Sequence, residues 1–226
     1  MSKTHTDREY ENQLRNVRDH LLSMGERVEA MIGNAIKALV ERDVDLAKAT
    51  IEADHTVNRL ELETDELCLV VLAKRQPMGS DLRFITLALK MVTDLERMGD
   101  IAVNICERVV DLSALEPLKP YEDIPRMAAA VQGMVHDAID AFVNADVERA
   151  QSVIDRDHEV NTLYTRVFRD VLALMVQNPA TIERGIHVQS VGKWLERMGD
   201  HATNLAEQVI FMVKGKDVRH LGKLGR

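Results

Sequence analysis

The stretch LERMGD occurs twice in the chain, at residues 95–100 within DLERMGDIAVNI and at residues 195–200 within WLERMGDHATNL. A second pair of similar stretches, ERDVDLAKATIEADHTVNRLE from Glu41 and NADVERAQSVIDRDHEVNTLY from Asn144, recurs with an offset of 103 residues rather than 100. Segments that repeat in the same order at a nearly constant offset indicate a tandem duplication. The chain is therefore two copies of one unit, with a three-residue difference in a loop.

Each copy is predicted to be helical. Hydrophobic residues make up 46% of the 226 residues and aromatic residues only 4%, and this supply of Leu, Val, Ile, Ala and Met favours helices. Apolar residues recur at helical spacing, and Pro77 and Pro179 interrupt the two copies at equivalent places. The predicted helices are residues 8–41, 44–75, 80–113, 122–144, 147–177 and 181–214.

Short connections between long helices make neighbouring helices antiparallel. The expected fold class is therefore all-α, a tandem duplication of two antiparallel three-helix bundles related by a pseudo-twofold axis. The expected domains are a first bundle at residues 1–115, a proline-containing linker at residues 116–125, and a second bundle with a basic C-terminal tail at residues 126–226.

Composition narrows the class of protein. The net charge is −8, which disfavours nucleic acid as a partner. The opening MSKTHTDREYENQLR is too polar for a secretory signal and no apolar run is long enough to span a bilayer, so we expect a cytoplasmic protein without direct membrane insertion. The basic tail VKGKDVRHLGKLGR is either a solvated terminus or a docking element.

Carboxylates dominate the repeated motif. Glu96 and Asp100 are four residues apart on one predicted helix, so both side chains lie on the same face. In an antiparallel hairpin that turns near residue 77, Asp54 and Asn58 of the preceding helix lie level with them. The second copy has the same four positions, occupied by Glu196, Asp200, Asp157 and Asn161.

Such a cluster of oxygen donors predicts a metal site. Carboxylate and amide oxygens without thiols suit Mg²⁺, Mn²⁺ or iron better than structural zinc. The alternative is a solvated acidic face in which Arg97 pairs with Asp100 and Arg197 with Asp200. His55 and His158 point away from the cluster, and His201 has no counterpart because residue 101 is Ile. Known catalytic motifs are missing, so no enzymatic activity is expected.

Four motifs in order resemble one known family. The doubled LERMGD, the turn AKRQPMGSDLR at residues 73–83, the first-helix stretch SMGERVEAMIGNAI and the closing VKGKDVRH are similar to those of the PhoU family, which accompanies bacterial phosphate-specific transport systems. The similarity extends from about residue 10 to residue 222.

The resemblance implies a non-enzymatic, cytoplasmic negative regulator of the phosphate-starvation response, recruited by its partners to the inner face of the membrane. Its implied partners are the ATPase of the phosphate ABC transporter, a phosphate-sensing histidine kinase and a second copy of the chain. It also implies multinuclear clusters of iron, manganese, magnesium or zinc on paired acidic motifs. Asn58 and Asn161 depart from the fully acidic pattern and bring no charge to a metal.

Two other hypotheses remain open from sequence. A metal-free helical adaptor would use its acidic faces to bind proteins, and its binding would weaken with salt but ignore chelators. A metal-dependent hydrolase or redox enzyme would use the same carboxylates to activate water. Turnover of phosphate esters, lost on Glu96→Gln, would distinguish the enzyme.

Overall fold

The computed structural model describes residues 3–118 and 122–215, with side chains from residue 8 onward. The basic tail from residue 216 lies outside the described residues, so its docking role stays a prediction. The helices are α1 (Lys3–Glu41), α2 (Val44–Arg75), α3 (Gly79–Ser113), α4 (Asp123–Asn144), α5 (Val147–Gln177) and α6 (Ile182–Lys214), with a short 3-10 helix η1 (Pro179–Thr181) before α6.

The two copies turn between their first and second helices in the same way. Asp43 and Asp146 are N-caps, and their side chains accept hydrogen bonds from the backbone N–H groups of Leu46 (2.9 Å) and Arg149 (3.0 Å). The preceding residues in both copies, Arg42 and Ala145, have left-handed backbone angles, with φ of 58° and 51°. Equivalent caps at equivalent positions confirm that the duplication extends to local geometry.

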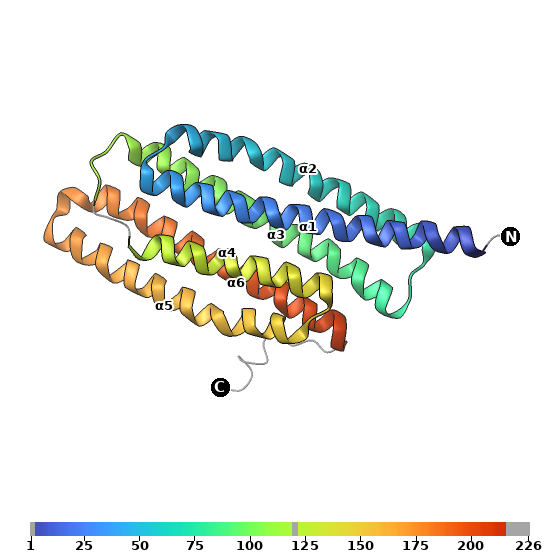
Figure 1. Cartoon of the computed structure of the whole chain (residues 1–226). Coiled ribbons are helices and arrows are strands. Elements are labelled where there is room, and N and C mark those ends of the chain that lie inside the picture. The colour runs from blue at the N-terminus through green and yellow to red at the C-terminus, as the bar shows by residue number, and fades with distance from the viewer. Residues whose placement is uncertain (1–2, 119–121, 216–226) are drawn as a thin grey trace.

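The helices form two three-helix bundles that pack side by side (Figure 1). In the first bundle α1, α2 and α3 contact one another, and in the second α4, α5 and α6 do so. Across the interface α3 contacts α6 and α1 contacts α4, so that repeat-equivalent helices pair, as a pseudo-twofold relation requires. The predicted all-α tandem fold is confirmed. One continuous apolar core runs through both bundles.

Polar contacts between the bundles depart from this symmetry. Asp94 of α3 is only 8% exposed, and its carboxylate contacts two side chains of α6. Its Oδ1 lies 2.9 Å from Nδ1 of His201, and its Oδ2 accepts a 2.9 Å hydrogen bond from Nε2 of Gln208. The repeat-equivalent residues of Asp94 and His201 are Trp194 and Ile101, so this link exists once.

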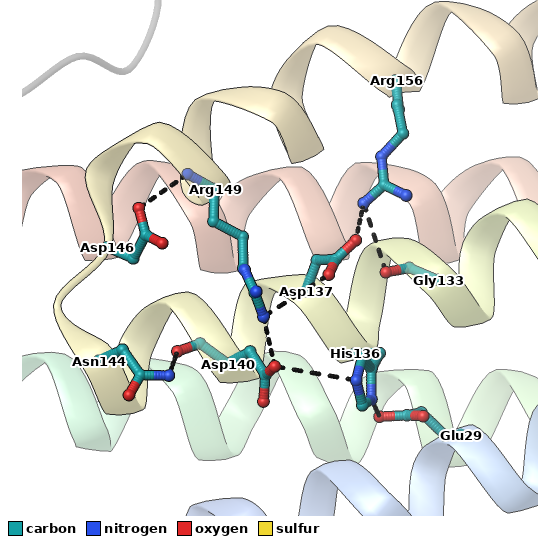
Figure 2. A network of polar contacts seen from close by, with 9 residues as sticks. All are labelled: Glu29, Gly133, His136, Asp137, Asp140, Asn144, Asp146, Arg149 and Arg156. Atoms are coloured by element: carbon teal, nitrogen blue, oxygen red, sulfur yellow. Dashed lines mark hydrogen bonds and ion pairs between the residues drawn. The ribbon is translucent and has the colours of Figure 1, made fainter.

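A second asymmetric set of contacts lies where α4, α5 and α1 meet (Figure 2). Arg149 and Arg156 of α5 form ion pairs with Asp140 and Asp137 of α4. His136 of α4 links Asp140 to α1: its ring lies 3.8 Å from the Asp140 carboxylate and 3.4 Å from the carboxylate of Glu29. The two arginines of α5 are therefore directed toward α4.

The predicted helix boundaries agree closely with the observed ones. The largest difference is at the start of α1, which begins at Lys3 rather than at residue 8. The start of α4 at Asp123 lies within the predicted linker, and a 3-10 turn precedes α6. None of the helices in the described ranges has an apolar stretch that could cross a bilayer.

Candidate functional site

The first hairpin, formed by α2 and α3, brings the predicted residues of the first copy together. At Gly99 of α3 an added Cβ would lie 2.9 Å from Oδ1 of Asp54 in α2 and 3.5 Å from Val57. A side chain at this position would force the Asp54 carboxylate to move, which favours glycine. Since Gly99 lies between Glu96 and Asp100 in α3, Asp54 is at the height along the hairpin that the antiparallel arrangement predicts, beside these two residues.

Asp54 is held by its neighbour in α2. Nδ2 of Asn58 donates a 2.8 Å hydrogen bond to Oδ2 of Asp54. The other carboxylate oxygen, Oδ1, is buried and has no hydrogen-bond partner, and the same is true of Oδ1 of Asn58. Buried acceptors without a donor are costly, since they lose hydration without compensation. They are the kind of atoms to which a cation or an ordered water binds.

The carboxylates of the first hairpin repel one another. The pKa of Asp54 is raised by burial and by the charge of Asp100. The pKa of Glu96 rises to about 7, chiefly through burial and then through Asp100 and Glu61, with smaller contributions from a hydrogen bond with Asp100 and the charge of Asp54. Raised carboxyl pKa values of this origin mark a site where positive charge would be stabilising.

Two residues of this site were missed by the sequence reasoning. Glu61 lies one turn beyond Asn58 on the same face of α2, and burial, Asp65 and Asp100 all raise its pKa. Asp65 follows one turn later, with a pKa raised by burial and a buried Oδ1 that lacks a partner. Their signal was the Glu61-x-x-x-Asp65 spacing, which repeats the spacing of Glu96 and Asp100.

The first hairpin therefore carries five carboxylates and one amide along a strip (Asp54, Asn58, Glu61, Asp65, Glu96 and Asp100). In the described part of the chain no base forms an ion pair with any of these carboxylates, so the alternative in which Arg97 pairs with Asp100 is wrong. Within the described ranges, no group of three Asp, Glu, His or Cys side chains is already close enough together to hold a metal ion. The donor chemistry fits a hard cation, and closing around one requires rotation of the carboxylate side chains.

The second hairpin, formed by α5 and α6, repeats part of this arrangement. A Cβ at Gly199 would lie 3.5 Å from Oδ1 of Asp157, and Asn161 donates a 2.6 Å hydrogen bond to the other oxygen. Oδ1 of Asp157 is buried without a partner, and burial, Asp200 and Glu196 raise its pKa. The nearest base in sequence, Arg156, is bound to Asp137 and does not neutralise this carboxylate (Figure 2).

A lysine distinguishes the second hairpin from the first. Nζ of Lys193, one turn before Glu196 on α6, forms an ion pair with the Glu196 carboxylate, and this hydrogen bond raises the pKa of Lys193. The ammonium group also lies 5.6 Å from the ring centroid of Tyr164, within cation–π range.

Neither His55 nor His201 belongs to the acidic face of its hairpin. The side chain of His55 is 78% exposed and pairs with Glu52, away from the hairpin face. His201 contacts Asp94 between the bundles and takes no part in a shared site.

We expect the metal-free protein to lose stability as pH rises from about 4.5 to about 7. The folded state raises the Glu96 pKa to about 7 from 4.5, so in this window it binds more protons than the unfolded state, and the free energy of unfolding falls with pH. Urea unfolding in EDTA at several pH values measures this effect.

The comparison with Glu96→Gln isolates the contribution of this one group. Its stability relative to wild type should improve from pH 5 to pH 7.5, whereas Glu159→Gln, on an exposed part of α5, should show no such trend. A wild-type stability that is level or rising across the window, with no difference in slope from Glu96→Gln, would contradict the assignment.

Fold and site together define a class of protein: an all-α tandem of three-helix bundles whose second and third helices carry acidic faces. The family model of the PhoU domain matches residues 21–109 and 124–209, one match in each bundle. The chain belongs to the PhoU family.

Individual relatives resemble the chain over almost its whole length. A phosphate-specific transport system accessory protein PhoU homolog of Pseudomonas aeruginosa is 39% identical over 219 residues, which cover 96% of this chain and 90% of that protein. The crystal structure of PhoU from Pseudomonas aeruginosa superimposes with a TM-score of 0.88 at 38% identity, covering 92% of this chain and 100% of that one. The crystal structure of the phosphate transport system regulatory protein PhoU from Streptococcus pneumoniae superimposes with a TM-score of 0.85 at 26% identity. The match covers 92% of this chain and 99% of that one.

Proposed function

We propose that this protein is an accessory regulator of a phosphate-specific transport system, without enzymatic activity of its own. The proposal is supported by relatives described as phosphate-specific transport system accessory proteins, which match nearly the whole chain. In this role it acts in the cytoplasm, reaches the inner face of the membrane through its partners, and relays the state of the phosphate ABC transporter to a phosphate-sensing histidine kinase. Phosphate-starvation genes then stay off, and uptake is restrained, when phosphate is plentiful. We further propose that it works as a homodimer.

The acidic strip of the first hairpin is the observation that carries the mechanism. Its carboxylates have no basic partner in the described residues, and buried oxygens of Asp54, Asn58 and Asp65 lack hydrogen bonds. Divalent or trivalent cations would be held by Glu96 and Asp100 of α3 with Asp54, Glu61 and Asp65 of α2. When bound, such ions supply positive charge that cancels the repulsion and exposed positions that a partner's carboxylates can ligate.

The chain's own residues set the shape of this face. Gly99 and Gly199 allow the backbones of α3 and α6 to approach the aspartates of α2 and α5. Asn58 and Asn161 fix those aspartates by hydrogen bonds, so that one oxygen of each remains available. Both faces are built on long helices, which makes them rigid platforms for recognition.

The metal-free adaptor is the second candidate function. It is favoured by the lack, in the described part of the chain, of any three donors already gathered around one point. In that case the acidic strips would bind basic surfaces of the partners directly, and binding would fall with ionic strength.

We expect the Asp100→Ala, Asp200→Ala double variant to lose repression of phosphate-starvation genes in phosphate-rich medium, because both hairpin faces lose a carboxylate. A phosphatase reporter in a strain lacking the native gene measures this. The matched control, Glu52→Ala with Asp155→Ala, removes two exposed acids from repeat-equivalent positions of α2 and α5 and should keep repression.

Metal analysis of the purified proteins then separates the two candidates. Metal in the wild type that is lost from the double variant supports the metal-bearing face. Lost repression with no metal in either protein, and unchanged circular dichroism, would favour the adaptor. Normal repression by the double variant would show that these faces are not the signalling surface.

A further inference from the structure

The acidic strip of α2 has no full counterpart in α5. At the offset of 103 residues that relates the helices, Asp54 and Asn58 correspond to Asp157 and Asn161. The next two positions of the strip, Glu61 and Asp65, correspond instead to Tyr164 and Phe168. The two aromatic rings lie 6.3 Å apart between centroids, so a pair of carboxylates has been replaced by an aromatic contact.

The third helices also differ at a position one turn before the glutamate of the LERMGD motif. Lys193 of α6 corresponds to Thr93 of α3 at the offset of 100 residues. Thr93 donates its hydroxyl hydrogen bond to the carbonyl of Leu89 in its own helix and adds no charge. Lys193 instead binds the Glu196 carboxylate and covers the ring of Tyr164.

The first hairpin retains the features of a cation site. Asp54 is 7% exposed, and its unpartnered Oδ1 faces the backbone at Gly99 in the centre of the strip. Five carboxylates share this strip without a basic partner in the described residues. In the second hairpin three carboxylates remain, and one of them already has an ammonium group as its counter-ion.

We propose that cation binding by this chain is concentrated in the first hairpin, and that Lys193 takes the place of a bound cation in the second. The inference rests on the proposed function, and it replaces two equivalent metal faces by two unequal ones. Affinity for hard cations follows the number of charged oxygen ligands, so a strip of five carboxylates is expected to bind them more tightly than three carboxylates that lie beside an ammonium group. The Lys193 ammonium neutralises Glu196 permanently, and no chelator can remove it.

The two faces would therefore respond differently to conditions in the cell. The charge of the first hairpin depends on the free concentration of cations, whereas that of the second is set by a covalently attached side chain. A partner that reads the first face is sensitive to metal supply, and one that reads the second face is less sensitive because that face binds cations more weakly.

The test exchanges the residues found at one position of the third helices, Thr93 and Lys193. Manganese(II) binding is followed by electron paramagnetic resonance of the free ion and by calorimetry, on the purified full chain after chelator treatment. Wild type should show a tight phase from the first hairpin and a weaker one from the second. Lys193→Thr should tighten the weaker phase about tenfold, and Thr93→Lys should weaken the tight phase about tenfold, because a charge is removed or added beside Glu196 or Glu96.

A further variant assigns the gained phase. Adding Asp200→Ala to Lys193→Thr should abolish the tighter manganese binding that Lys193→Thr gives the second hairpin. Circular dichroism and melting curves verify that each variant is folded. Two equal tight phases in wild type, or no change on Lys193→Thr and Thr93→Lys, would overturn this inference while leaving metal-dependent regulation intact. An absence of manganese binding in every protein would overturn both.

Discussion

Replacing Phe142 with alanine is expected to lower the free energy of unfolding by about 3–5 kcal/mol. Phe142 of α4 is 1% exposed, and its ring stacks on Phe84 of α3 with centroids 5.4 Å apart and planes 15° apart. Removing it forfeits apolar burial and leaves a cavity that long, rigid helices cannot close. Urea unfolding at constant pH, with EDTA present so that bound metal adds no stability, measures the loss.

Phe168 provides the matched control because it allows the same substitution on a surface. Its side chain is 41% exposed on α5, so Phe168→Ala should cost less than about 1 kcal/mol. Phe142→Leu, which introduces the residue found at the equivalent position 39, should cost less than Phe142→Ala. Equal losses for the two alanine variants would mean that the aromatic stack between the bundles is not a major source of stability.

Replacing Asp94 with alanine is expected to cost about 2–4 kcal/mol. The substitution leaves Nδ1 of His201 and the amide of Gln208 facing a largely buried interface with no acceptor. Removing one member of a buried polar set is more damaging than the net value of its hydrogen bonds, because the remaining groups stay desolvated.

A double-mutant cycle with His201→Ile, which restores the residue found at position 101, tests this account. Because the two side chains are in direct contact, their coupling energy should lie in the range of about 0.5–3 kcal/mol. The Asp94→Asn variant keeps the shape and one acceptor, so it should lose less than Asp94→Ala. Purely additive effects of the two changes would show that the contact contributes nothing to stability.

Much of the fold could be predicted because its determinants are local or repeated. The helix ends depend on residues close in sequence, such as Asp43, Asp146 and Pro179, whose capping and backbone effects are known. The duplication made each assignment in one copy a check on the other. Even the position of Asp54 beside the LERMGD motif follows from counting residues from the turn along the two antiparallel helices.

The candidate site was only partly predictable. Counting placed Asp54 and Asn58 beside the LERMGD motif, but it treated the site as one level of the hairpin rather than a strip. Glu61 and Asp65 extend the strip along α2, and their pKa values show that the added carboxylates interact electrostatically with the others. Their absence from the second copy, where Tyr164 and Phe168 stand, concealed them from a search for shared residues.

Contacts between the copies could not be derived from the repeat. Because Ile101 is the counterpart of His201, the repeat assigns His201 no shared role, yet this mismatch marks a place where the two bundles differ. Which residue of α3 meets His201 depends on how two long helices are placed against each other, and no local pattern determines this. The packing of α3 against α6 places Asp94 beside His201.

The hydrogen bonds of Asp94 also bear on how the chain assembles as it is made. Two copies of the first bundle, placed face to face in the same way, would set Asp94 against Ile101 and Arg108. Two copies of the second would set Trp194 against His201 and Gln208. Two second bundles would therefore lack the carboxylate that accepts these hydrogen bonds between unlike bundles, whereas two first bundles would place Asp94 beside the basic Arg108. Divergence of the two copies at these positions therefore disfavours the pairing of second bundles with one another.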